Sequence, residues 1–209
     1  MFITFEGIEG SGKSLQIGRA AARLEGRGIP CLLTREPGGT EFGRALRRVL
    51  LSPGGGRREP WSELLLYLAD RHQHLREVIG PALGRGQVVL CDRYQDATRA
   101  YQGAARGIPL DDIERVARLL GVVEPDRTVL LDLDPETGLG RARARNGSDP
   151  AAAAEGRFED EDLSFHRRVR AAYLDLARRF PGRIEVVDAA GSPDEVSARV
   201  RALLDRWLP

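Results

Sequence analysis

Five short apolar runs recur along the chain, separated by longer stretches in which apolar residues return every three or four positions. The runs predict strands at 2–6, 31–35, 88–92, 128–134 and 184–188. Their apolarity is continuous rather than alternating, which indicates that helices cover both faces of the sheet. The pattern therefore predicts one α/β domain, 1–209, built on a five-stranded parallel sheet.

The stretches between these runs predict helices. LQIGRAAARLEGRG, which ends at Gly28, and ERVARLLG, which ends at Gly121, are amphipathic, and glycine is a common helix stop. Two segments lack periodicity: 51–59 is expected to be a loop, and 146–157 a mobile excursion between arginine-rich helical stretches. Periodic sequence resumes on both sides of each, so neither predicts a domain boundary, and no internal repeat occurs.

The ends of the predicted strands indicate where a ligand would bind. In open parallel sheets, ligands bind beyond the carboxyl ends of the strands. In this chain those ends carry charged residues: Glu6, Arg35, Asp92, Asp132 and Asp188. We therefore expect the functional site along this edge of the sheet.

Composition narrows the class of ligand. The chain has 42% hydrophobic and 30% charged residues and a net charge of +1, so nucleic acids and membrane surfaces have no electrostatic support as partners. It contains no apolar run of about 18 residues and no signal-peptide pattern at its start. We expect a cytoplasmic protein with a small ligand, in which Cys31 and Cys91 are buried, reduced thiols.

The segment GIEGSGKS fits the phosphate-binding pattern G-x-x-x-x-G-K-[ST], with a predicted strand before it and a helix after it. Backbone N–H groups of such a loop, together with the helix N-terminus, face an anion. Lys13 is the one lysine among 32 lysines and arginines, and its compact ammonium suits the β- and γ-phosphates better than a planar guanidinium. Ser14 is expected to hold Mg²⁺. The loop residues expected at ATP are Gly7, Ile8, Glu9, Gly10, Ser11, Gly12, Lys13 and Ser14.

A P-loop indicates triphosphate binding but leaves the reaction open. A GTPase would need a lysine in its guanine-reading N-K-x-D motif, and no lysine follows Lys13. A hydrolytic ATPase or a P-loop switch usually has a glutamate after its second acidic strand end, where VVLCDRY has Arg93 after Asp92. A cation beside the metal-site carboxylate suits a second anion, which favours phosphoryl transfer to a phosphorylated acceptor.

Four further motifs carry a family resemblance. TREPGGT, DRY at 92–94, AYQG at 100–103 and LDLDPETGLGRARAR at 131–145 resemble bacterial thymidylate kinases, in family order, from residue 2 to the last helix. The resemblance implies a P-loop NTPase fold with strand order 2-3-1-4-5, a homodimer, and transfer of the γ-phosphoryl of Mg-ATP to dTMP, giving dTDP and ADP. The alternatives are another nucleoside monophosphate kinase, a deoxynucleoside kinase, or a non-transferring ATP-binding switch.

The resemblance also implies roles at the acceptor site. Arg93 would grip the acceptor phosphate, Asp92 would serve the metal and the phosphates, and Tyr101 would lie against the deoxyribose. Tyr67 would stack on thymine, or else pack in the core, and Arg71, one helical turn on, would donate to a thymine carbonyl. Ala97 stands where the family commonly has serine. The residues expected at dTMP are Glu9, Arg35, Glu36, Pro37, Tyr67, Arg71, Arg93, Thr98, Tyr101 and Gln102.

The resemblance indicates that the glutamate at position 9 turns toward the acceptor, to its sugar 3′-hydroxyl or, through water and metal, to its phosphate, so positions 8–11 supply no cation for the transferring phosphoryl group. The resemblance implies that a lid, about 141–160, supplies this cation. It favours Arg157, with Arg145 as a helper, at the γ-phosphoryl, and it places Arg143 nearer the adenine. Arg141, also expected at ATP, shares a helix face with Arg145, whereas Arg143 lies on the opposite side. A solvated charged helix is the alternative. The three histidines, His72, His74 and His166, are expected to be helix-surface residues.

Overall fold

A computed structural model of the chain describes residues 1–54, 56 and 58–208. Its five strands form one parallel sheet in the order β2-β3-β1-β4-β5, which confirms both the predicted strands and the predicted order. The strands are β1 Phe2–Glu6, β2 Cys31–Arg35, β3 Val88–Asp92, β4 Arg127–Asp132 and β5 Ile184–Asp188.

The strand register brings the predicted motifs together. β1 lies at the centre of the sheet, so the P-loop that follows it starts between the ends of β3 and β4. Arg35 of β2 is in register with Asp92 of β3, and Phe5 of β1 is in register with the same aspartate. The second strand end and the DRY motif therefore meet beside the P-loop.

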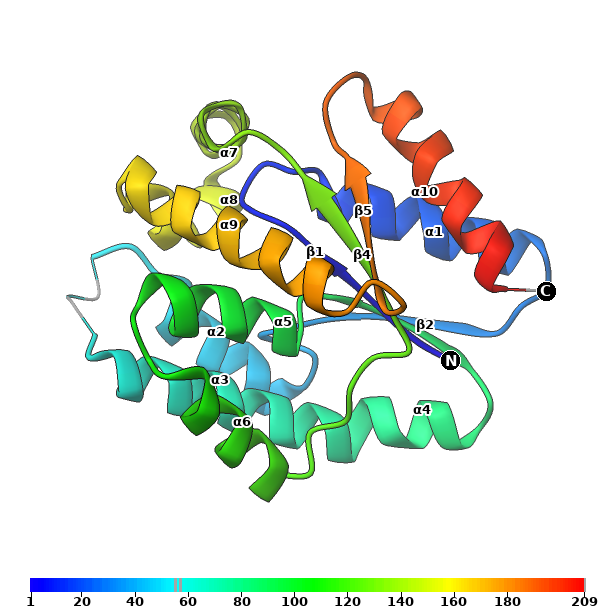
Figure 1. Ribbon diagram of the computed structural model, residues 1–209, viewed down its shortest axis with the longest axis horizontal. Coiled ribbons are helices and arrows are strands. Elements are labelled where there is room, and N and C mark those ends of the chain that lie inside the picture. Colours follow the sequence, from blue (N-terminus) through cyan, green and yellow to red (C-terminus); the bar gives the residue numbers. More distant parts are fainter. Residues whose placement is uncertain (55, 57, 209) are drawn as a thin grey trace.

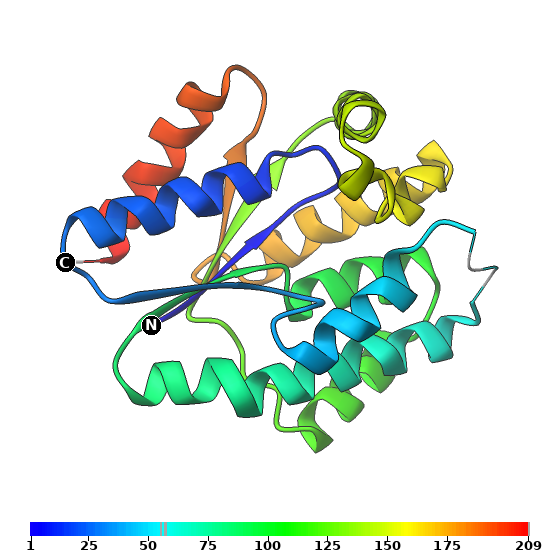
Figure 2. The same cartoon turned by 180° about the vertical axis from the view of Figure 1, so that it is seen from behind.

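Helices cover both faces of this sheet, as predicted (Figures 1 and 2). Helices α1 and α10 pack side by side on one face, and α4 and α9 pack against the other. The helical elements are α1 Lys13–Gly26, α2 Glu41–Leu51, α3 Pro60–His74, η1 Leu75–Ile79, α4 Gly80–Gly84, α5 Gln95–Thr98, η2 Arg99–Ala105, α6 Leu110–Leu119, α7 Pro135–Ser148, α8 Pro150–Ala153, η3 Arg157–Asp160, α9 Leu163–Arg179 and α10 Pro193–Trp207.

Alternate side chains of the strands build a core on each face. Ile3 and Phe5 join the larger core, which includes α1, whereas Phe2 and Val89 pack with η1 and α4. All four side chains are at least 98% buried. The continuous apolar runs are thus explained by cover on both sides. Both cysteines are free thiols, Cys91 buried and Cys31 partly buried.

The segment 146–157 is more regular than its sequence predicts. Helix α7 continues to Ser148, and α8 follows at once, with the Asp149 carboxylate accepting from the Ala151 N–H at its start. Proline at the first helical position and a run of alanines favour this short helix, although they give no amphipathic period. In the other aperiodic segment, Leu51 closes α2, and 55 and 57 lie outside the described residues.

None of the helices in the described ranges is both long enough and apolar enough to cross a membrane.

Candidate active site

A cleft of about 540 Å³ opens along the carboxyl edge of the sheet. Most of the predicted site residues line it: Glu9, Gly10, Lys13, Ser14, Arg35, Glu36, Pro37, Tyr67, Arg71, Asp92, Arg93, Thr98, Tyr101, Gln102 and Arg145. The other predicted residues lie outside this lining: Gly7, Ile8, Ser11, Gly12, Arg141, Arg143 and Arg157.

The strand ends divide into two groups. Arg35 and Asp92 line the cleft, as the sheet-edge rule predicts. Glu6 is buried beneath it, where desolvation and the nearby negative charge of Asp96 raise its pKa to about 7. Both carboxylate oxygens of Asp132 accept hydrogen bonds from Arg170, at 2.7 and 2.8 Å, on the side of the sheet that α9 covers.

The P-loop is packed tightly against the start of α7. Gly10 has φ +70°, and a Cβ atom there would lie 2.0 Å from the carbonyl oxygen of Gly138. A Cβ atom on Gly138 would in turn lie 2.6 Å from the Glu9 carbonyl oxygen. The close approach requires glycine on both sides. The LDLDPETGLG segment therefore acts as a wall of the P-loop.

Lys13 is held inside the loop. Its Nζ donates to the carbonyl oxygens of Gly7, at 3.0 Å, and Ile8, at 2.7 Å. Burial lowers the pKa of Lys13 to about 8, and the positive charge of Arg93 acts in the same direction. The loop thus holds a compact, buried ammonium that two backbone carbonyl oxygens orient.

Ser14 and Asp92 lie together at the start of α1. The Ser14 hydroxyl donates to Asp92 Oδ2 at 2.9 Å, and both side chains line the cleft. A hydroxyl and a carboxylate are oxygen ligands of the kind that Mg²⁺ takes alongside water and phosphate. The donor set fits the predicted metal.

Arg93 adopts an unusual backbone conformation, with φ 67°. A non-glycine residue in this left-handed region costs about 1–2 kcal/mol, and such strain is often found at functional sites. The guanidinium lies 4.8 Å from the centre of the Tyr101 ring, and its Nη2 donates to Glu9 Oε1 at 2.8 Å. The turn directs this cation across the P-loop rather than along the strand.

Glu9 faces the residues predicted at the acceptor. Besides Arg93, the Tyr101 hydroxyl donates to Glu9 Oε1 at 2.6 Å. Burial alone would raise the pKa of Glu9, but Arg93, His166 and Lys13 together hold it well below its usual range. The P-loop therefore presents a lysine on one side and a permanently charged carboxylate on the other.

Arg71 is fixed at the opposite end of the cleft. Its Nε donates to Glu36 Oε2 at 2.7 Å, and its Nη1 donates to Gln95 Oε1 at 2.6 Å and to Thr98 Oγ1 at 2.9 Å. This guanidinium is 2% exposed, so its orientation is set before a ligand arrives. Tyr67, one turn earlier on α3, lines the cleft and also packs against the core, and its stacking on thymine stays a prediction.

Two histidines are placed differently from the prediction. His72 is exposed, but His74 and His166 are fully buried, so the expectation of surface positions is wrong for these two. His74 bridges Thr34 Oγ1, at 2.7 Å, and Glu36 Oε1, at 3.0 Å. His74 is buried because the connection between β2 and α2 lies over this end of α3. The periodicity of one helix cannot show that another segment packs over its exposed side.

The four lid arginines point in different directions. Arg157 forms an ion pair with the buried carboxylate of Glu63, which also accepts from Gln102 Nε2 at 2.8 Å. Arg145 lines the cleft and donates to Glu159 Oε1 at 3.0 Å. Arg143 donates to the Glu159 carbonyl oxygen and Arg141 to that of Ala189. Only some of the predicted lid cations are therefore close to the cleft in this conformation.

Several cleft residues escaped the sequence prediction. Arg47 of α2 donates through Nε and Nη2 to the two oxygens of Glu155, at 2.7 and 2.6 Å, and so joins α2 to the segment predicted as a lid. Glu155 and Glu159 also line the cleft. The sequence signal is weak because Glu155 lies in the aperiodic segment and Glu159 follows just after it, where carboxylates are usually solvated surface charges.

Comparison with known proteins agrees with this geometry. The family model described as thymidylate kinase matches residues 5–200. The chain belongs to the thymidylate kinase family. It is 54% identical over 211 residues to a thymidylate kinase of Solidesulfovibrio magneticus, with 100% of each chain covered. It is 54% identical over 200 residues to one of Syntrophotalea carbinolica, with 95% of this chain and 92% of the relative covered.

A solved structure gives the same assignment. The thymidylate kinase of Ehrlichia chaffeensis superposes with a TM-score of 0.75 at 33% identity, and 98% of each chain is covered. The predicted family and the predicted fold are confirmed. Membership of the thymidylate kinase family also favours a phosphoryl-transfer enzyme over a non-transferring ATP-binding switch.

Proposed function

We propose that this thymidylate kinase family member transfers the γ-phosphoryl group of ATP to dTMP, giving ADP and dTDP. The observation that carries the proposal is that two phosphate-binding cations from different motifs, Lys13 and Arg93, line one cleft with Glu9 between them. A hydrolase needs one phosphate site, whereas a nucleotide kinase needs two.

In the proposed reaction, a phosphate oxygen of dTMP forms a bond to the γ-phosphorus while the bond to the β,γ-bridging oxygen breaks, and the electron pair leaves with ADP. Lys13 and the P-loop amides hold the donor phosphates, and Arg93 holds the acceptor phosphate in line. Arg71, fixed by Glu36, Gln95 and Thr98, would donate to the thymine. No general base is needed, because the acceptor phosphate is already nucleophilic at neutral pH.

We also propose that Ser14 and Asp92 hold Mg²⁺, since their oxygens are close enough to share one ion. When bound, the ion would neutralise charge on the donor phosphates. The lid, about 141–160, would supply a further cation and exclude water. A cytoplasmic location stays a prediction.

Substrate identity is tested by ADP formation from ATP with dTMP, dUMP, dCMP, AMP and thymidine offered in turn. We expect dTMP to give the highest kcat/KM. Stimulation by AMP but not by dTMP would indicate another nucleoside monophosphate kinase. Stimulation by thymidine alone would indicate a deoxynucleoside kinase. Equal turnover with and without an acceptor would indicate an ATP-binding switch.

The activity should have an alkaline limit set by Lys13. Since its pKa in the free protein is lowered to about 8, kcat/KM for ATP should fall as pH rises through about 8 and the ammonium loses its proton. Bound phosphates stabilise the charged form, so kcat at saturating ATP should fall only at higher pH. Initial rates at limiting and saturating ATP, from pH 6 to about 10, measure the alkaline fall of kcat/KM and of kcat. If both constants fell over the same pH range, the assignment of the alkaline limit to Lys13 would be contradicted.

We propose a homodimer formed by the outer face of α2 and α3. Phe42 and Val49 on α2 and Trp61 and Leu65 on α3 are large apolar side chains exposed by 44–55%, and the two helices pack side by side. Exposed apolar residues gathered on neighbouring helices are typical of a protein interface. Arg71 belongs to the buried face of α3, so dimerisation through the exposed face would support the helix that carries it.

Leu65→Arg should convert the dimer to a monomer, because a charge placed in an apolar interface loses its hydration without gaining a partner. Light scattering coupled to size-exclusion chromatography measures the mass directly. The matched control is Val186→Arg, which places the same charge on a side chain of similar exposure, 48%, on edge strand β5. A dimer that persists in Leu65→Arg, or a monomeric wild type, would contradict the proposed interface.

A further inference from the structure

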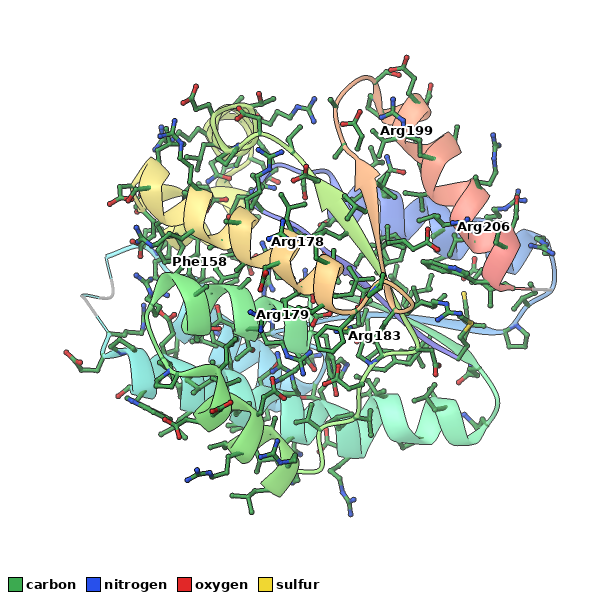
Figure 3. The ribbon with its side chains drawn as sticks, in the orientation of Figure 1. Phe158, Arg178, Arg179, Arg183, Arg199 and Arg206 are labelled. Carbon is green, nitrogen blue, oxygen red and sulfur yellow. The ribbon has the colours of Figure 1, made fainter. Side chains whose placement is uncertain are left out.

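A buried histidine of α9 lies between the lid and the P-loop. His166 Nδ1 is 3.1 Å from Glu9 Oε2, and its Nε2 is 3.0 Å from the carbonyl oxygen of Phe158 in η3. The side chain is 0% exposed. Figure 3 labels Phe158 near the N-terminal half of α9, whereas Arg178 and Arg179 lie toward the other end of that helix. One imidazole thus contacts two elements that the reaction requires to act together.

The neighbours of this ring define the role of one of its nitrogens. The Phe158 carbonyl oxygen is an acceptor, so Nε2 presents its N–H there, whereas Nδ1 lies 3.1 Å from Glu9 Oε2 without hydrogen-bond geometry between the two atoms. The charged and titratable groups around the pair are Glu9 itself, Arg93, Lys13 and Tyr101 at the P-loop side, and Glu159 on η3. Within this set, Arg93 and Tyr101 contact Glu9 at Oε1, and the imidazole approaches it at Oε2.

The Glu9 carboxylate has a polar group close to each of its oxygens. Arg93 and Tyr101 donate to Oε1, whereas the His166 Nδ1 lies 3.1 Å from Oε2. Rotation of the carboxylate would break both hydrogen bonds at Oε1 and would move Oε2 away from the imidazole, so the three groups together favour one orientation. The Phe158 carbonyl, which also accepts from the Glu161 N–H at 3.2 Å, ties this orientation to the η3 turn.

Building on the proposed function, we propose that His166 is a positioning residue that orients the Glu9 carboxylate toward the acceptor nucleotide and fastens the η3 turn of the lid to the P-loop. The residue does not touch the reacting atoms. Its effect passes through Glu9 on one side and through Phe158 on the other.

Kinetics of His166→Phe test the acceptor side, because phenylalanine keeps the ring but donates no hydrogen bond. We expect kcat/KM for dTMP to fall about 10-fold to 100-fold, as misplacement of a positioning group does, while KM for ATP stays unchanged. His72→Phe, the same exchange at the exposed histidine of α3, should leave both constants unchanged. An unchanged kcat/KM for dTMP in His166→Phe would overturn the proposal.

A double-mutant cycle with Glu9→Gln tests whether the effect of His166 on the acceptor passes through Glu9. If His166 acts through Glu9, the two substitutions together should cost about as much as Glu9→Gln alone. Additive losses in kcat/KM for dTMP would show that His166 acts elsewhere and would overturn the proposed coupling.

One measurement needs no dTMP turnover. Hydrogen exchange of the Glu161 amide should be faster in His166→Phe than in His72→Phe, and equal rates would overturn the contact between His166 and η3. By contrast, if the exchange rates differ as expected but the wild type does not phosphorylate dTMP, only the proposed function is refuted.

Discussion

Replacing Lys13 with arginine is expected to lower kcat about 10³-fold, although the charge is kept. The Lys13 Nζ fits within 3.0 Å of two loop carbonyl oxygens, and a guanidinium is too broad to occupy that point without opening the loop. Loss of one preorganised donor at a developing charge costs about 10²–10³ in rate, and here the lost contact would serve two phosphates. A 10³-fold loss corresponds to about 4 kcal/mol of transition-state stabilisation.

The measurement is single-turnover phosphoryl transfer at saturating ATP and dTMP. Arg19→Lys is the control, since it makes the reverse exchange on the same helix, where the side chain pairs with Asp194 at the surface. It should retain wild-type kcat and, because exposed ion pairs contribute little, wild-type stability. A Lys13→Arg enzyme with kcat near wild type would show that charge alone, rather than shape, matters at this position.

Removing the lid cation should also lower kcat by about 10³-fold, the usual contribution of an arginine finger. We expect Arg145→Ala to show this loss, because Arg145 lines the cleft. To reach the γ-phosphoryl group, Arg157 would have to leave Glu63, a carboxylate that is 1% exposed and whose pKa, despite burial, is lowered chiefly by Arg157. Separating a buried ion pair is unfavourable, since each partner must find a new one.

Arg157→Ala should therefore act mainly on stability. Gln102 and Arg106 still contact Glu63, so the expected loss is that of one charged hydrogen bond, about 1.5–3 kcal/mol in the free energy of unfolding. Urea unfolding and kcat, measured on both alanine variants, separate the roles. If Arg157→Ala instead lost kcat while keeping its stability, Arg157 would be the finger that resemblance to the family favours, and its pair with Glu63 a resting position.

Much of the fold could be predicted because its strongest signals are local. Continuous apolar runs such as VVLC, followed by an acidic residue, allow few structures other than a covered parallel strand. The P-loop was equally clear, since its pattern came with the strand and helix that it requires. The order of the strands in the sheet has no such local signal. It is implied by the resemblance to the family, because five similar apolar runs do not show which strands lie next to each other.

Only the site residues that belong to a recognisable motif could be predicted from the sequence. Arg71 and Arg93 were found because each belongs to a motif, whereas the Glu63 partner of Arg157 is 94 residues away from it in sequence. Likewise His166 is one polar residue on an amphipathic helix, and its burial depends on η3 and the P-loop, which close over that face. Long-range pairing of charges leaves no periodic pattern in the sequence, so the sequence predicts His166 on the helix surface and Arg157 at the γ-phosphoryl group, and it gives no sign of Glu63.

The contact between Gly10 and Gly138 limits where the predicted lid, about 141–160, could bend. At their closest the two backbones leave no room even for a methyl group, so the first turn of α7 cannot slide over the P-loop without disturbing the phosphate pocket. Gly140, two residues on, has open space around it. We therefore expect the hinge of the lid to lie beyond Gly138, within the helix itself. The base of the lid would then be a stationary part of the ATP pocket, and only its outer portion a gate.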